Sequence, residues 1–106
     1  QKGREKEAEE VLREVIKIDS KNIMSRTELG KLLSKQKGRE KEAEEVLREV
    51  IKIDPRNLHA RTVLAKLFED CNRQIEAVLL YQEVCKYNPG NLYGESGLKR
   101  LKKYMK

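Results

Sequence analysis

Residues 36–54 read QKGREKEAEEVLREVIKID, and residues 1–19 carry the same letters 35 positions earlier. Similarity continues beyond the identical block, because NIMSRTELGKL from Asn22 aligns with NLHARTVLAKL from Asn57. A third and more divergent unit follows at an offset of 34 residues. Repeats of this length predict a solenoid built from pairs of helices, each unit burying its apolar face against the next.

Apolar residues in each unit recur at the spacing of one helix face. Ala43, Val46, Leu47, Val50 and Ile51 follow the i, i+3, i+4, i+7, i+8 pattern. The same periodicity along the chain predicts six helices, over about residues 4–18, 23–36, 40–53, 58–71, 74–87 and 92–104.

Residues that start and stop helices lie between these segments. An asparagine precedes three of the helices, where its side chain can accept from free backbone amides: Asn22, Asn57 and Asn91. A residue that tolerates a left-handed backbone occupies the turn before each of the other three: Gly3, Gly38 and Asn72. The pairs Asp54–Pro55 and Asn88–Pro89 stop the helices before them.

Composition excludes several classes of protein. Charged residues make up 40% of the chain and aromatic residues 5%, which suits thin helical layers better than a wide globular core. No apolar run approaches the roughly 18 residues of a membrane helix. Cys71 and Cys85 lack metal or redox spacing, so we expect no metal or other cofactor, two reduced thiols and a cytoplasmic protein. Because the chain begins with Gln1, we expect it to be part of a longer protein.

The units resemble the tetratricopeptide repeat family. Leu29–Gly30 stands at the family's Leu-Gly pair, Ala43 at its small-residue position, Leu47 at the facing bulky position and Pro55 at its closing proline. The third unit follows the pattern with Leu64–Ala65, Phe68, Ala77, Tyr81 and Pro89. The sequence departs from the family where Thr27 and Arg61 replace an aromatic residue, and where residues 35–40 hold one extra residue.

This resemblance implies an all-α, right-handed superhelical solenoid of antiparallel helix pairs. The chain would be one repeat domain, in which residues 1–22 are a partial repeat with only its second helix, 23–57 and 58–91 are full repeats, and 92–106 form a C-terminal capping helix. Because this partial repeat lacks its first helix, the apolar residues of the remaining helix would be partly uncovered: Val11, Leu12, Val15 and Ile16. We expect the chain to self-associate or swap there.

In the family, the first helix of each pair lines a concave groove. The first-helix segments are basic here, with net charges of +3 for residues 20–35, +1 for 55–71 and +4 for 90–106. The implied groove residues are Thr27, Lys31, Lys35, His59, Thr62, Lys66, Tyr93, Ser96 and Arg100. Because Lys31, Lys66 and Arg100 recur at one position of the repeat, they would attract an acidic or C-terminal peptide segment.

The sequence therefore predicts a protein- or peptide-binding scaffold rather than an enzyme. His59 is the only histidine and has no metal-binding partner nearby, and the acidic cluster at residues 40–45 is expected to be a solvated face with pairs such as Glu44–Arg48. Tyr81 and Tyr87 are expected in the core. An RNA-binding helical repeat and a structural spacer within a longer array are the alternatives, and the scarcity of exposed aromatic residues disfavours single-strand binding.

Overall fold

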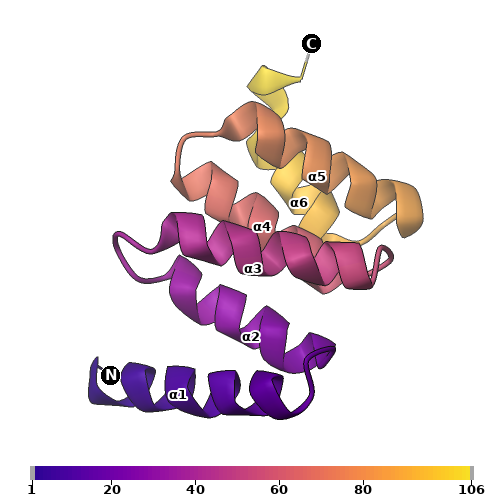
Figure 1. Ribbon diagram of the computed structural model, residues 1–106. Helices are drawn as coiled ribbons and strands as arrows, with labels where there is room; N and C mark the ends of the chain where they lie inside the picture. Colours follow the sequence, from indigo (N-terminus) through magenta and orange to yellow (C-terminus); the bar gives the residue numbers. More distant parts are fainter. Residues whose placement is uncertain (1, 106) are drawn as a thin grey trace. The chain divides into compact units, whose positions relative to one another are not determined.

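The computed structural model describes residues 2–105, which contain helices and no strand (Figure 1). The helices in chain order are α1 (Lys2–Ile18), α2 (Ile23–Ser34), α3 (Glu40–Ile53), α4 (Leu58–Asp70), α5 (Gln74–Tyr87), α6 (Leu92–Arg100) and the short 3-10 helix η1 (Lys102–Tyr104). Within this range, no helix is both long and apolar enough to cross a membrane.

The chain divides into two compact units, Gln1–Pro55 and Arg56–Lys106. In the first unit, α2 packs against both α1 and α3. In the second, α5 packs against α4, α6 and η1. The boundary at Pro55 falls beside the junction between the two predicted full repeats.

All three asparagine caps predicted from the sequence are confirmed. The Asn22 side chain accepts from the Ser25 amide at 2.8 Å, and the Asn57 side chain accepts from the Ala60 amide at 2.7 Å. Asn91 caps α6 in the same way at 3.0 Å. Each cap satisfies an amide in the first turn that no helical carbonyl can reach, and so defines where α2, α4 and α6 begin.

Two of the three predicted left-handed turns are also present. Gly38 has φ 91° in the five-residue connection between α2 and α3, and Asn72 has φ 63° in the three-residue connection between α4 and α5. Gly3 was predicted to be a third such turn, and this is wrong because Gly3 lies inside α1.

The core of the first unit is built around a close approach of α2 and α3. Leu29, Leu33, Leu47 and Val50 are buried, with Leu47 completely inaccessible. A Cβ placed on Gly30 would lie only 2.6 Å from Cγ and Cδ2 of Leu47. The glycine therefore leaves the space that the leucine side chain occupies, which is the physical reason for a small residue at this position.

The second unit repeats this arrangement with an aromatic side chain. The ring of Tyr81 on α5 is 2% exposed, and a Cβ on Gly97 of α6 would lie 2.6 Å from its atoms. Phe68 is buried as well. Tyr81 is thus a core residue as predicted, but Tyr87 is not. It is 42% exposed, and the guanidinium groups of Arg56 and Arg61 lie 5.3 and 5.1 Å from its ring centroid.

The last helix is shorter than predicted. Helix α6 ends at Arg100, and residues 102–104 form η1 instead of continuing to residue 104 as α-helix. Leu101, between the two helices, is buried, and η1 packs against α5. Residues 102–104 therefore pack on α5 as a 3-10 turn.

Candidate protein-binding site

The predicted groove residues of the first unit come from α2 and its C-terminal cap. Lys31 and Lys35 are one helical turn apart, so they lie on one face. Neither lysine forms an ion pair with another residue in the range 2–105. Thr27 differs from them because its side chain is buried and its hydroxyl donates to the Ile23 carbonyl at 2.9 Å. The accessible polar groups of this set are therefore the two lysines.

Helix α4 supplies the next three predicted residues. His59 is exposed, and Thr62 donates its hydroxyl to the His59 carbonyl at 2.8 Å. The ammonium of Lys66 lies 3.0 Å from a carboxylate oxygen of Asp70, with both side chains about 60% exposed. An ion pair so open to water contributes little to stability, so its partners can be exchanged at small cost.

Helix α6 supplies the last three predicted residues. Tyr93 is 70% exposed, and Ser96 donates its hydroxyl to the Leu92 carbonyl at 2.8 Å. Arg100 binds the Glu69 carboxylate through two nitrogens, at 2.9 and 3.1 Å. This pairing joins α6 to α4 and occupies the fork of the guanidinium group.

Glu69 is the centre of a small network in the second unit. Besides the two bonds from Arg100, its carboxylate accepts from the Tyr81 hydroxyl at 2.7 Å. The hydrogen bonds from Arg100 hold the pKa of Glu69 below its ordinary value. Burial and the hydrogen bond to Glu69 raise the pKa of Tyr81. Arg100 is therefore a structural residue that holds α6 in place, and its charge is largely neutralised.

Sequence reasoning identified the cations of this site but missed the carboxylates that pair with them. The Lys66–Asp70 pair has the i, i+4 spacing of a helix and could have been found from the sequence. The Glu69–Arg100 pair spans 31 residues and carries no local signal. It depends on how α4 and α6 are brought together.

A polar hollow in the first unit is also neutralised from within. It is lined mainly by Glu5, Glu9, Arg13, Gln36 and Arg39. Arg39 holds Glu9 at 2.6 and 2.8 Å, and Arg13 reaches the same carboxylate at 2.9 Å. The hydrogen bond from Arg39 lowers the pKa of Glu9 to about 2. Because the arginines and glutamates here neutralise each other in ion pairs, the hollow has no excess charge with which to attract a ligand.

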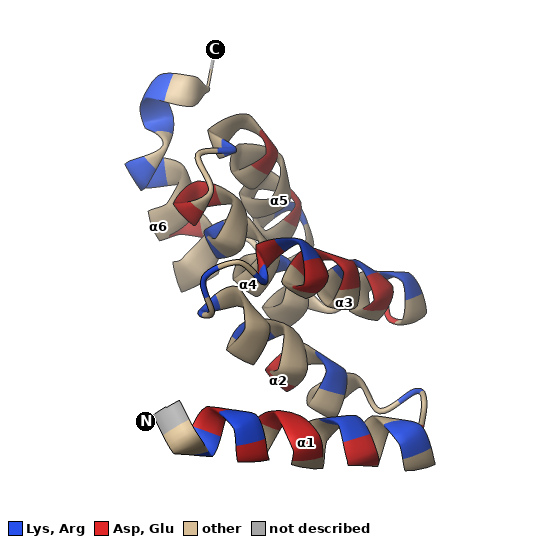
Figure 2. Ribbon diagram, turned by 60° about the vertical axis from the view of Figure 1, so that its left-hand side comes forward, with Lys and Arg blue, Asp and Glu red and all other residues tan. Residues whose placement is uncertain are grey.

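The second helices of the repeats carry charges of both signs. Figure 2 shows Lys and Arg alternating with Asp and Glu along α1 and α3, whereas α2 is mostly uncharged along its length. The predicted pair Glu44–Arg48 on α3 is confirmed, with a separation of 2.9 Å. The thiols of Cys71 and Cys85 are not joined in a disulfide, and burial raises the pKa of Cys85.

The chain belongs to the tetratricopeptide repeat family, whose model matches residues 1–67. Among solved structures, the TPR domain of OM64 from Arabidopsis superposes with a TM-score of 0.85 and 21% sequence identity. The alignment covers 97% of this chain and 84% of that domain, which shows that the two share a fold. Comparison with curated proteins gives no match. The predicted family and all-α fold class are thereby confirmed. Tetratricopeptide repeats are non-enzymatic scaffolds that bind proteins or peptides.

Proposed function

We propose that this scaffold binds an acidic segment of a protein partner, with the first contact made by Lys31 on α2 and by Lys35 at its C-terminal cap. The proposal rests on the position of these two lysines and on their lack of ion pairs. They share one helix face and have no carboxylate partner among residues 2–105. Two like charges one turn apart repel each other weakly, and an acidic ligand relieves that repulsion.

In the second unit, taken by itself, Lys66 is the cation that we propose is open to an acidic group. Its partner Asp70 is an exposed carboxylate that a carboxylate from the ligand can replace. Arg100 takes no part in this proposal, because displacing Glu69 would break its bonds to both Arg100 and Tyr81. We place this activity in the cytoplasm, where Cys71 and Cys85 would stay reduced.

A fluorescently labelled peptide rich in Asp and Glu, with a free C-terminus, tests the proposal by anisotropy. The site variant is Lys31→Gln/Lys35→Gln, and the matched control is Lys41→Gln/Lys52→Gln, two exposed lysines of α3. Both variants lower the net charge of the chain by the same amount. We expect the site variant to bind the peptide about tenfold more weakly at low salt, and the control to bind it nearly as the parent chain does.

Two further probes separate the alternatives. Comparison with the same peptide carrying an amidated C-terminus shows whether the chain recognises a terminal carboxylate. A single-stranded RNA oligonucleotide tests nucleic-acid binding. Equal loss in both variants would mean that net charge alone drives binding, which contradicts the assigned site. RNA binding that exceeds peptide binding and falls steeply with salt would favour the RNA-binding alternative.

A second interaction that we propose is association through the exposed face of α1, with a second copy of the chain as the simplest case. Ala8 and Val11 on this helix are exposed, Val11 to 62%. Apolar surface in this position favours contact with another polypeptide. Sedimentation over a range of chain concentrations tests whether two copies associate, and a monomer at all concentrations would exclude that case.

A further inference from the structure

The last residues of the second unit include lysines that no carboxylate neutralises. These are Lys99 at the end of α6 and Lys102 and Lys103 in η1, and all three are exposed. None of them forms an ion pair with another residue in the range 2–105. Arg100 lies among them in sequence but is bound to Glu69. We call the three lysines the basic end of the chain.

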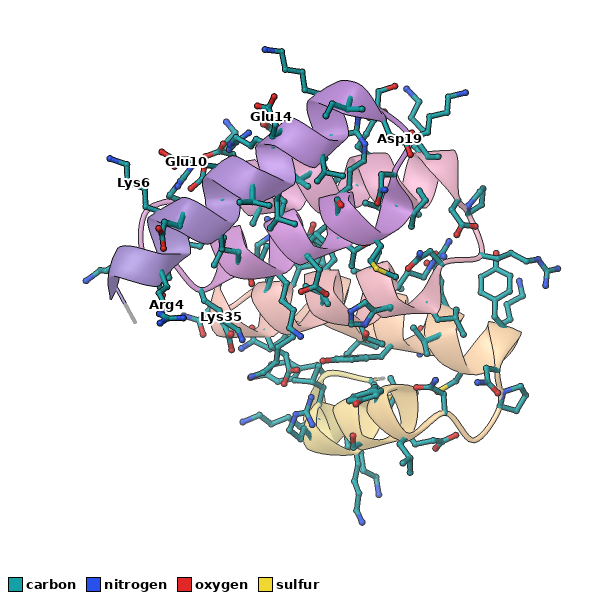
Figure 3. All side chains as sticks on the ribbon, turned by 90° about the horizontal axis from the view of Figure 1, so that it is seen from below. Arg4, Lys6, Glu10, Glu14, Asp19 and Lys35 are labelled. Carbon is teal, nitrogen blue, oxygen red and sulfur yellow. The ribbon has the colours of Figure 1, made fainter. Side chains whose placement is uncertain are left out.

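Charges are distributed differently on the second helices of the repeats. On α1, Lys6, Glu10 and Glu14 follow one another, so cations and carboxylates share one face (Figure 3). At the basic end, residues 99–103 contain no carboxylate, and Figure 2 shows Lys and Arg gathered there. Charges that alternate in sign cancel at a distance, whereas grouped charges of one sign attract a polyanion.

Glu95, the acidic residue of α6, does not neutralise the basic end. It lies one helical turn before Lys99, a spacing that permits an ion pair, but the two form none. Its carboxylate instead accepts a hydrogen bond from the Cys85 thiol on α5, and burial together with this carboxylate raises the pKa of that thiol. The basic end therefore keeps its charge.

Exposed apolar side chains stand at the other end of α6. Leu92 is 81% exposed and Tyr93 is 70% exposed. Leu92 and Lys99 are seven residues apart, which places them on one face of the helix. Gly94 and Gly97 are buried where α6 packs on α5. The exposed face of α6 is thus apolar in its first turn and basic from its last turn onward.

We infer that this exposed face of α6 and the basic end together bind the surface of a membrane that contains anionic lipids. The three lysines lie against the headgroups, where each cation near an anionic surface strengthens binding. Leu92 and Tyr93 enter the boundary between headgroups and acyl chains, which favours apolar and tyrosine side chains. No helix within residues 2–105 can cross a membrane, so the contact is with its surface.

A lipid surface accounts for both parts of this face, whereas other polyanions account for only one. RNA phosphates or a highly acidic peptide can neutralise the lysines, but they offer little apolar surface to cover Leu92. A lipid surface offers anionic headgroups and acyl chains side by side. The inference goes beyond the proposed binding of an acidic segment, which uses Lys31 and Lys35 of the first unit.

Flotation of the complete chain with lipid vesicles tests the inference. The vesicles consist of phosphatidylcholine alone or of phosphatidylcholine with about 30% phosphatidylserine. The site variant is Lys99→Gln/Lys102→Gln/Lys103→Gln. The matched control is Lys6→Gln/Lys17→Gln/Lys41→Gln, which removes three exposed lysines from α1 and α3 and changes the net charge equally. Glutamine has nearly the helix propensity of lysine, and circular dichroism checks that both variants are folded.

We expect the parent chain to bind only the vesicles that contain phosphatidylserine. Each lysine should contribute about fivefold at low salt, so the site variant should bind on the order of 100-fold more weakly, and the control within about threefold of the parent chain. Leu92→Ser/Tyr93→Ser keeps the charge and should weaken binding about tenfold. The Lys31→Gln/Lys35→Gln chain should still bind the vesicles, which separates this inference from the acidic-segment site.

Three results would overturn the inference. Equal loss in the site variant and the control would show that net charge alone draws the chain to the vesicles. Binding that Leu92→Ser/Tyr93→Ser leaves unchanged would show that no apolar side chain enters the lipid. Single-stranded RNA that binds the parent chain more tightly than the vesicles do, and that the site variant no longer binds, would assign the basic end to nucleic acid.

Discussion

Leu47→Ala and Leu12→Ala make the same change in the same local sequence, one in α3 and the other in α1. Leu47 is fully buried against Gly30, so its truncation removes apolar contacts and leaves a cavity. We expect this to lower the free energy of unfolding by about 2–5 kcal/mol. Leu12 is half-buried beside an uncovered face, so its truncation should lower the free energy by only about 1 kcal/mol.

Urea unfolding followed by circular dichroism at 222 nm measures both values. Helix propensity and charge are the same at the two positions, so any difference arises from tertiary packing. We expect the midpoint for Leu47→Ala to lie well below that for Leu12→Ala at a similar slope. Unfolding free energies of the two variants that agree within about 0.5 kcal/mol would refute the reasoning, because the two blocks would then be equally packed.

Two further predictions concern packing and pH. Gly97→Ala places a Cβ 2.6 Å from the ring of Tyr81 and should lower the unfolding free energy by about 1–3 kcal/mol. A Cβ at Gly3 has no neighbour within 4 Å, so Gly3→Ala should leave the unfolding free energy unchanged or raise it. Thermal melts compare both variants with the parent chain, and an equal or higher melting temperature for Gly97→Ala would contradict the close contact. The pKa of Glu9 lies at about 2 beside Arg39, below its ordinary 4.5, so its stabilising effect is complete above pH 4.5 and is lost as the pH falls toward 2. Unfolding midpoints measured across that range should fall further for the parent chain than for Glu9→Gln, and parallel curves would show that the ion pair contributes nothing.

The candidate site was only partly predictable from the sequence. Repeat spacing placed Lys31, Lys66 and Arg100 at one equivalent position of the repeat. Lys66 is exposed and Lys31 is half-buried, which is compatible with ligand binding. The spacing did not indicate that Arg100 is bound to Glu69. A repeat pattern assigns equivalent positions, whereas the charge available to a ligand depends on partners from other helices.

What the sequence determined by itself is the local structure of the chain. Apolar periodicity and the asparagine caps established where α2, α4 and α6 begin, because these signals act between residues three or four apart. The tertiary structure decided which surfaces are used. The same letters EKEAEEVLREVIKI form a covered helix as residues 40–53 in α3 and a half-open one as residues 5–18 in α1, since burial depends on the helices packed alongside and not on the residues of the helix itself.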